Sequence, residues 1–170
     1  MQLTRASEYA ILGLLALARR PLSAVAMVDV LANEEGIPTS FLGKIFQNLA
    51  KVGIVKSARG SGGGFTLVRS AEEISVLEII EAVEGPIALQ RCLEPSSDCT
   101  HMGGCALCGL FSEAQDRVKE VFSTTNLAQL SARHTSFVEH QSRHSKTGPK
   151  HTKEIQLIQP SRTKPFSTKL

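Results

Sequence analysis

The fold of this chain is decided by residues 39–69, which read TSFLGKIFQNLAKVGIVKSARGSGGGFTLVR. In the first half, apolar residues follow the i, i+3, i+4, i+7 spacing of a core-facing helix surface: Leu42, Ile45, Phe46 and Leu49. The opposite surface carries only polar or basic side chains, namely Ser40, Lys44, Gln47 and Lys51. We therefore predict a two-faced helix that is capped by Thr39 or Ser40 and runs to about Val52, with Gly53 as its stop.

The second half of this stretch has the pattern of a β-hairpin. Residues 54–59 and 65–69 are predicted strands, and the glycine-rich run 60–64 between them can adopt positive φ and approach another surface closely. A glycine-rich run can also form a nucleotide phosphate loop. That motif ends in Gly-Lys-Ser/Thr and opens a helix, whereas a strand pattern follows here, so we favour the hairpin.

Two further helices are predicted before this stretch. Residues 4–19 are apolar almost all round, which is typical of a helix buried on more than one side. Residues 22–32 form the second predicted helix, with Ser23 as its cap and a turn at 34–38. Three helices followed by a basic hairpin are the order of a winged helix-turn-helix, in which the third helix enters the DNA major groove. The expected fold class is mainly α with a small β wing.

The chain after the hairpin is predicted to contain a long helix with an unusual apolar face. Ser75 caps a fourth helix through residue 84, residues 87–91 are extended, and the long helix covers about 105–123, with Thr125 capping a short helix at 126–132. Spacings of four and three residues along the long helix resemble a coiled-coil seam, formed by Leu107, Phe111, Ala114, Val118 and Val121. We expect a homodimer; packing against the chain's own domain is the alternative.

Charge is segregated along the chain. The net charge is +3, but seven basic and two acidic side chains lie from His134 onward, so the first 133 residues carry a slight negative excess. Residues 36–71 nevertheless contain five basic and no acidic side chains. Such a segment is the electrostatic footprint of a phosphate-backbone partner, although a solvated face without a partner has the same composition. The polar, basic tail from His134 is expected to be disordered.

No targeting or membrane segment is expected. The apolar run 10–18 is far shorter than the roughly 20 residues of a membrane span, and Glu8 before it and Arg19 after it argue against a secretion signal. We therefore expect a cytoplasmic protein with no membrane partner. In that compartment clustered cysteines are more often metal ligands than disulfides.

Four cysteines, the only ones in the chain, lie within seventeen residues: Cys92, Cys99, Cys105 and Cys108. Thiolates that converge on one point hold iron–sulfur clusters. Four thiolates also suit a tetrahedral zinc site, and Cys105 with Cys108 could serve as a metal-free redox pair. The spacing alone leaves all three open.

Several segments together resemble the Rrf-type transcription regulators, the family of the iron–sulfur regulator IscR and the nitric-oxide sensor NsrR. These are LTRASEYA at residues 3–10, the wing RGSGGGF at 59–65, the first three cysteines, and TTNLA at 124–128. The resemblance covers about residues 1–133. It implies a homodimer that binds specific double-stranded promoter DNA under the control of an iron–sulfur cluster sensing redox state, nitric oxide or iron and cluster supply. Repression or activation, and [2Fe-2S] or [4Fe-4S], stay open, with repression and the two-iron form favoured.

The resemblance also implies site residues. DNA contacts are expected from the third helix and the wing, at Ser40, Lys44, Gln47, Lys51 and Arg59. Several relatives have a polar or acidic side chain where this chain has Gly43, so their sequence preference does not transfer. Cys92, Cys99 and Cys105 are the expected cluster ligands. The fourth is either Cys108, where IscR-like proteins have a histidine, or Glu8 of a partner subunit, as in the NsrR-like pattern; we favour Cys108.

The expected organisation has four parts: a DNA-binding domain at 1–86, a cluster-binding loop at 87–109, a dimerisation helix and short helix at 110–133, and a tail at 134–170. The alternative within the same class is a zinc-stabilised or thiol-redox DNA-binding regulator. Other classes are a small iron–sulfur electron carrier and a zinc-stabilised adaptor for proteins. No catalytic arrangement stands out in the sequence, so we expect no enzyme activity.

Overall fold

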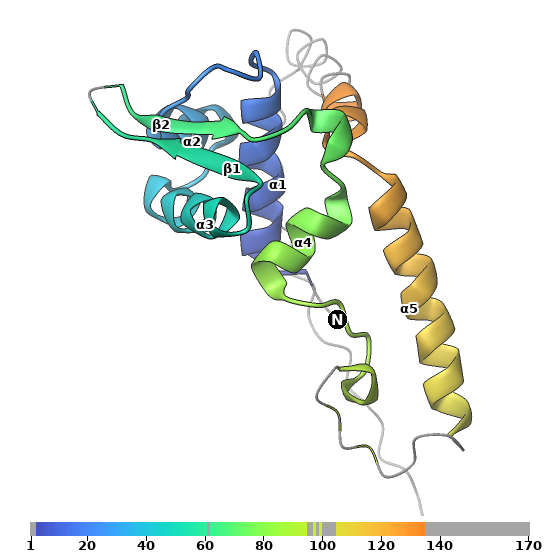
Figure 1. Cartoon of the computed structure of the whole chain (residues 1–170). Helices are drawn as coiled ribbons and strands as arrows, with labels where there is room; N and C mark the ends of the chain where they lie inside the picture. Colours follow the sequence, from blue (N-terminus) through green and yellow to red (C-terminus); the bar gives the residue numbers. More distant parts are fainter. Residues whose placement is uncertain (1–2, 61, 95–96, 98, 100–104, 135–170) are drawn as a thin grey trace, which may run out of the picture.

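The computed structural model describes residues 3–60, 62–94, 97, 99 and 105–134. The tail after His134, for which disorder is expected, lies outside them. The described chain is mostly helical with a two-stranded sheet (Figure 1). In chain order, its elements are α1 (Arg5–Ala18), α2 (Val28–Glu35), α3 (Thr39–Lys51), β1 (Val55–Ala58), β2 (Gly64–Leu67), the 3₁₀ helix η1 (Ala71–Glu73), α4 (Val76–Glu84), the 3₁₀ helix η2 (Arg91–Leu93) and α5 (Ala106–Thr124).

Helix α1 is the centre of the core, as its apolar circumference predicts. Its residues Ala10, Leu14 and Ala16 are fully buried, and α2, α3 and α4 pack around it. Gly13 lets α3 come close: a Cβ there would lie 2.7 Å from Leu42 Cδ1 and 2.8 Å from Phe46 Cε2. The sequence thus places the apolar face of α3 against α1 and leaves its polar face outward.

The wing is an antiparallel hairpin in which Val55 pairs with Leu67 and Ala58 with Gly64. A third segment adds to it, since Ala26 N–H donates to the Phe65 carbonyl and Phe65 N–H to the Ala26 carbonyl, both at 2.9 Å. The prediction of a helix over residues 22–32 is therefore wrong for its first half. Within this segment Ala26 pairs its backbone N–H and carbonyl with Phe65, far along the chain, and local periodicity cannot reveal such a pairing.

The segment after α5 is joined by backbone hydrogen bonds to the N-terminus of α4. The Val76 N–H donates to the Thr125 carbonyl and the Leu127 N–H to the Ile74 carbonyl, both at 2.9 Å. A short helix over residues 127–134 follows. Its cap is Asn126, which exchanges side chain–backbone hydrogen bonds with Gln129 at 2.8 and 3.0 Å. Thr125, the predicted cap, instead donates its hydroxyl to the Val121 carbonyl.

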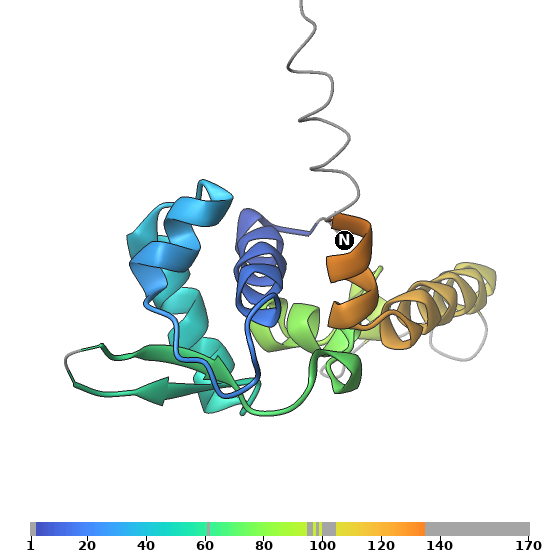
Figure 2. The ribbon, with the colours of Figure 1, turned by 90° about the horizontal axis from the view of Figure 1, so that it is seen from above.

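These elements form the predicted winged helix with a long added helix. Both views place the hairpin and α3 on one side of α1 and α5 on the other (Figures 1 and 2). The fourth helix starts and stops as predicted, because Ser75 accepts a hydrogen bond from Glu78 N–H and Gly85 follows its last residue. Of the helices in the described ranges, none is long and apolar enough to cross a membrane.

Candidate functional site

The outer face of α3 and the wing carry the side chains predicted to contact DNA. Every one of the five is exposed on the surface, whereas the apolar face of the same helix is buried. They are Ser40, Lys44, Gln47, Lys51 and Arg59. The two elements lie on the same side of α1 (Figure 2), and we call their exposed polar and basic residues the basic face. Lys56 of β1 is also exposed, and we include it in this set.

The basic face differs from the other cations of residues 3–86 because its charges are not neutralised. Within the described chain, the remaining basic side chains of this unit all have carboxylate partners: Arg5 with Glu8, Arg19 with Glu35, Arg20 with Glu34, and Arg69 with Glu78. No such ion pair involves Lys44, Lys51, Lys56 or Arg59 in the described residues. The basic stretch of sequence thus becomes a positive surface on α3 and the wing only, which favours an anionic partner there.

The wing tip requires glycine for geometric reasons. Gly60 and Gly62 have φ of 112° and 104°, a region that other residues rarely adopt. A Cβ at Gly63 would lie 2.6 Å from the Ala58 carbonyl oxygen, and one at Gly64 would lie 2.1 Å from that of Ala26. The glycine run therefore serves the hairpin and its third segment, as predicted, and no helix follows it to form a nucleotide loop.

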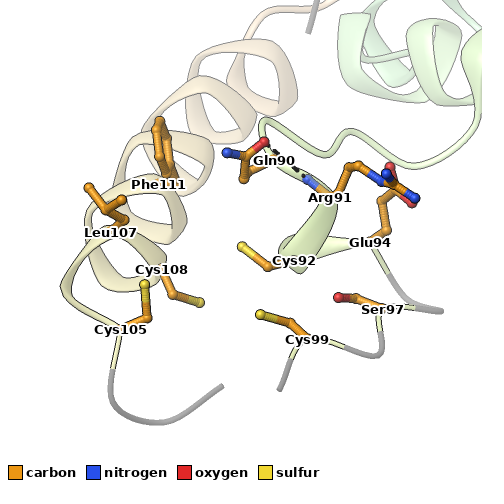
Figure 3. A pocket seen from close by; sticks show the side chains of 10 residues that line it. All are labelled: Gln90, Arg91, Cys92, Glu94, Ser97, Cys99, Cys105, Leu107, Cys108 and Phe111. Atoms are coloured by element: carbon orange, nitrogen blue, oxygen red, sulfur yellow. Dashed lines mark hydrogen bonds between the residues drawn. The ribbon is translucent and has the colours of Figure 1, made fainter. Parts of the chain in front are cut away.

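All four cysteines line a single open cavity of about 670 Å³ between η2 and the first turn of α5. Three sulfur atoms point into its centre from different segments: Cys92 from η2, Cys99 from the loop and Cys108 from α5 (Figure 3). The side chain of Cys105 is directed along the start of α5 in this view. The wall also contains Gln90, Arg91, Glu94, Ser97, Leu107 and Phe111.

The cysteine thiols are close enough to influence one another. The pKa of Cys92 is raised, first by desolvation, then by a hydrogen bond with Cys108 and by the nearby charges of Cys108 and Cys99 when ionised. As placed, no three His, Cys, Asp or Glu side chains of the described chain are near enough to hold a metal ion together. The donor set nevertheless fits a soft metal or an iron–sulfur cluster, since four free cysteines line one cavity. Binding would have to draw these thiols closer.

The cavity is connected to α4 and α5 by hydrogen bonds that sequence reasoning did not anticipate. Gln115 of α5 accepts from the Leu89 N–H at 3.1 Å. Glu81 of α4 accepts from the Ile87 N–H at 3.3 Å and lies 3.5 Å from the Lys119 ammonium. These polar residues of α5 and α4 have no local signal for such a role, because the partners are six to thirty-eight positions apart. Together they join the segment before Cys92 to both helices.

Helix α5 keeps an apolar stripe exposed. The described residues of this helix include none that is fully buried, and three of its large apolar side chains are about 60% exposed: Leu107, Leu110 and Val121. Phe122 instead packs against Val76 and Ile80 of α4. Phe111, which the predicted seam includes, faces the cysteine cavity, and Leu110 takes its place on the stripe. The sequence did contain a signal for this, because Leu110 lies three residues after Leu107 and so falls on the same surface of the helix.

Glu8, the rival fourth ligand, lies elsewhere in the chain. It lines a separate hollow of about 320 Å³ at the start of α1 with Leu3, Thr4 and Arg5. Beside this hollow, Glu84 accepts hydrogen bonds from the hydroxyls of buried Ser7 and of Thr4, both at 2.6 Å, which lower the pKa of Glu84. Cys108 therefore shares the cavity of the other cysteines, whereas Glu8 of the same chain does not line it.

Comparison with known proteins shows which family shares this sequence and which solved structures share this fold. Residues 3–133 match the family model described as Rrf2, iron-dependent transcriptional regulator. The HTH-type transcriptional regulator IscR of Photorhabdus laumondii is 32% identical over 130 residues, which cover 76% of this chain and 79% of that protein. The structure of CymR, the global cysteine regulator of B. subtilis, superposes with a TM-score of 0.65 at 26% identity and covers 78% of this chain and 98% of CymR. IscR of T. potens shares the fold, with a TM-score of 0.61, 19% identity and coverage of 88% and 94%.

Proposed function

This chain belongs to the Rrf2 family of transcriptional regulators, which are not enzymes, and from that premise we propose a homodimer whose binding to specific promoter DNA is controlled by an iron–sulfur cluster. The observation that carries the proposal is the single cavity lined by all four cysteines, at the start of α5. A cytoplasmic location follows from the proposal itself, because the promoter is the target.

The basic face supplies the DNA contacts in this proposal. Lys44, Lys51 and Arg59 present charged donors that no carboxylate of the described chain neutralises. The phosphates of DNA can therefore neutralise them. Gln47 offers the amide geometry that pairs with an adenine edge. Arg59, beside the glycine tip, is suited to a narrow minor groove next to the α3 site.

The cysteine cavity holds the cluster, with Cys92, Cys99, Cys105 and Cys108 as ligands. A cluster supplies a centre whose charge and ligand demand change with redox state, nitric oxide or cluster supply. The position of Cys108 within the cavity supports it as the fourth ligand, and the rival is Glu8 of a partner subunit. The two-iron form remains favoured over the four-iron form.

In this proposal, a change at the cysteine cavity reaches the DNA-binding unit through α5. Cys105 and Cys108 lie at the first turn of α5, and the far end of that helix is joined to Ile74 and Val76 of the DNA-binding unit. Drawing the thiols together would pull on α5 and on the Gln115–Leu89 link. In the dimer, the exposed stripe of Leu107, Leu110 and Val121 meets its copy, so a shift of α5 changes the spacing of the two α3 helices.

The test uses the full chain purified anaerobically. Iron and sulfide content and visible absorbance report the cluster, and fluorescence anisotropy compares DNA affinity of the loaded and metal-free forms at one salt concentration. We expect at least a tenfold difference in affinity; equal affinities would refute cluster control. Cys108→Ser should lose iron, whereas Glu8→Gln, the matched control, should keep it. The reverse result would assign the fourth ligand to Glu8.

A metal-free or zinc-bound thiol regulator is the second candidate, favoured by the sulfur atoms of Cys92 and Cys108, which point into the same cavity (Figure 3). Oxidised glutathione would accept two electrons and two protons from these thiols, leaving a Cys92–Cys108 disulfide and two glutathione molecules. A colourless protein with one zinc per chain, or with this disulfide in its peptide mass map and altered DNA affinity, would replace the cluster proposal by this one.

A further inference from the structure

Phe41 is an exposed aromatic residue on the element that the proposed function places in DNA. It is the third residue of α3, and 61% of it is accessible to solvent. Its neighbour Leu42 is fully buried, so the exposure of Phe41 is a property of its helical position and not of a loose helix. Phe41 does not belong to the buried core clusters of the described chain.

The surroundings of Phe41 favour DNA over an apolar partner. In the sequence of α3 it lies between Ser40 and Lys44, and α3 contains no acidic residue. The described residues contain no carboxylate partner for the Lys44 ammonium. Both α3 and the wing lie on the side of α1 opposite to α5 (Figures 1 and 2). Charge complementarity therefore points to a polyanion as the occupant of this surface.

The position of Phe41 within α3 suits a base contact. In helix-turn-helix proteins the N-terminal residues of the second, recognition helix reach the base edges of the major groove. Gly43 also favours a close approach of α3 to the bases, because nothing lies within 4 Å of the place where its Cβ would be. The helix therefore has no side chain at that position to hold it away from the bases.

A phenylalanine can make only an apolar contact, and this decides what it can recognise. Among the groups that base pairs present in the major groove, the apolar one is the C5 methyl group of thymine. We propose that Phe41 packs on a thymine methyl group and makes that thymine a specificity determinant of the operator. The inference rests on the proposed DNA binding but not on the cluster.

The test removes one methyl group without changing any hydrogen bond. A duplex is first selected from a random pool by the wild-type full chain. Each thymine of that duplex is then replaced singly by deoxyuridine, and affinity is measured by fluorescence anisotropy at one salt concentration. We expect about a fourfold loss at one thymine in each half-site, the factor expected for burying one methyl group, and little change at the other thymines.

Two variants separate base reading from general affinity. Phe41→Ala should bind the thymine and the deoxyuridine duplexes equally well at the sensitive position. Lys44→Ala, the control, should bind both more weakly while keeping their ratio. Because Phe41 is exposed, its truncation is expected to leave the fold intact, and the deoxyuridine series on the unaltered protein needs no variant.

The outcomes distinguish the two proposals. If wild-type protein selects a duplex but tolerates deoxyuridine at every thymine, the inference is overturned and the proposed function stands. The inference is overturned in the same way if Phe41→Ala keeps the wild-type discrimination. If no duplex is selected from the pool by either the loaded or the metal-free protein, the proposed function fails and this inference with it.

Discussion

Replacing Gly13 and Gly43 singly by alanine should change stability in opposite directions. Both glycines lie inside helices, Gly13 in α1 and Gly43 in α3. Alanine is better than glycine in a helix interior by about 0.8–1 kcal/mol. At Gly43 the new methyl group meets nothing within 4 Å. The Gly43→Ala variant should therefore be more stable than wild type by up to about 1 kcal/mol.

At Gly13 the same methyl group has no room. It would lie 2.7 Å from Leu42 Cδ1 and 2.8 Å from Phe46 Cε2, well inside the 3.5–4.0 Å of a favourable carbon contact. Phe46 cannot easily yield, because it is fully buried and its ring stacks edge-on against Phe65 at 5.2 Å. Overpacking of this kind costs about 1–3 kcal/mol. After the propensity gain, Gly13→Ala should be less stable than wild type by up to about 2 kcal/mol.

The assay is urea unfolding of the full-length, metal-free protein, followed by far-UV circular dichroism. The two variants should differ in unfolding free energy by about 1–3 kcal/mol, with Gly43→Ala the more stable, and their denaturant slopes should match that of wild type. Equal stabilisation of both variants would show that α1 and α3 are not packed as closely as the structure has them. A less stable Gly43→Ala would refute the surface position of Gly43.

Three further predictions concern the N-terminal unit. Glu84→Gln should lower stability at neutral pH. The hydrogen bond from Ser7 keeps the folded-state pKa of Glu84 below its usual 4.5. The stability that the Glu84 carboxylate contributes is therefore present above pH 4.5 and is lost on acidification. The difference in unfolding free energy between the variant and wild type, measured in urea, should shrink as pH falls below about 4.5. Lys44→Ala should reduce the slope of log affinity for DNA against log salt by about 1. Gly64→Ala should displace the wing, because its Cβ would lie 2.1 Å from the Ala26 carbonyl oxygen, and DNA affinity should fall at least tenfold.

Each of these has a matched control. Glu72→Gln removes an exposed carboxylate of η1 and is the control for the same change of charge at the surface. Arg117→Ala, on α5, should leave the salt slope unchanged, and Gly109→Ala has open space around it and should leave DNA affinity intact. A pH-independent Glu84→Gln effect, an unchanged salt slope for Lys44→Ala, or full DNA binding by Gly64→Ala would each contradict the corresponding argument.

Local sequence was sufficient wherever an element depends on its own residues. The apolar spacing of α3 predicted both its buried face and its basic face, and Ser75 and Gly85 predicted the ends of α4. It failed at residues 22–27, where the backbone is not helical and Ala26 pairs with Phe65, some forty positions away. Helical periodicity measures only the near neighbours of a residue, so a third strand-like segment at the wing was invisible to it.

The cysteine site, too, was predicted in part by the sequence and revealed in part only by the structure. Sequence spacing identified four soft ligands and left Cys108 and Glu8 as rivals. The structure puts Cys108 in the cavity of the other cysteines and Glu8 of the same chain in a different hollow, and the rival ligand stays Glu8 of a partner subunit. The links through Gln115, Glu81 and Lys119 had no sequence signal, because a polar residue on a helix reveals its partner only when the helices are packed.

By itself, then, the sequence determined a winged helix with a basic third helix, a glycine-rich hairpin tip and a clustered set of thiols, because periodicity, glycine chemistry and residue type act locally. Tertiary structure alone decided which cations remain unpaired: Arg19, Arg20 and Arg69 meet carboxylates, whereas Lys44 and Arg59 have none in the described chain. It also decided that Phe111 faces the cysteines while Leu110 faces solvent. Both outcomes depend on the relative positions of helices, which packing sets and residue order does not record.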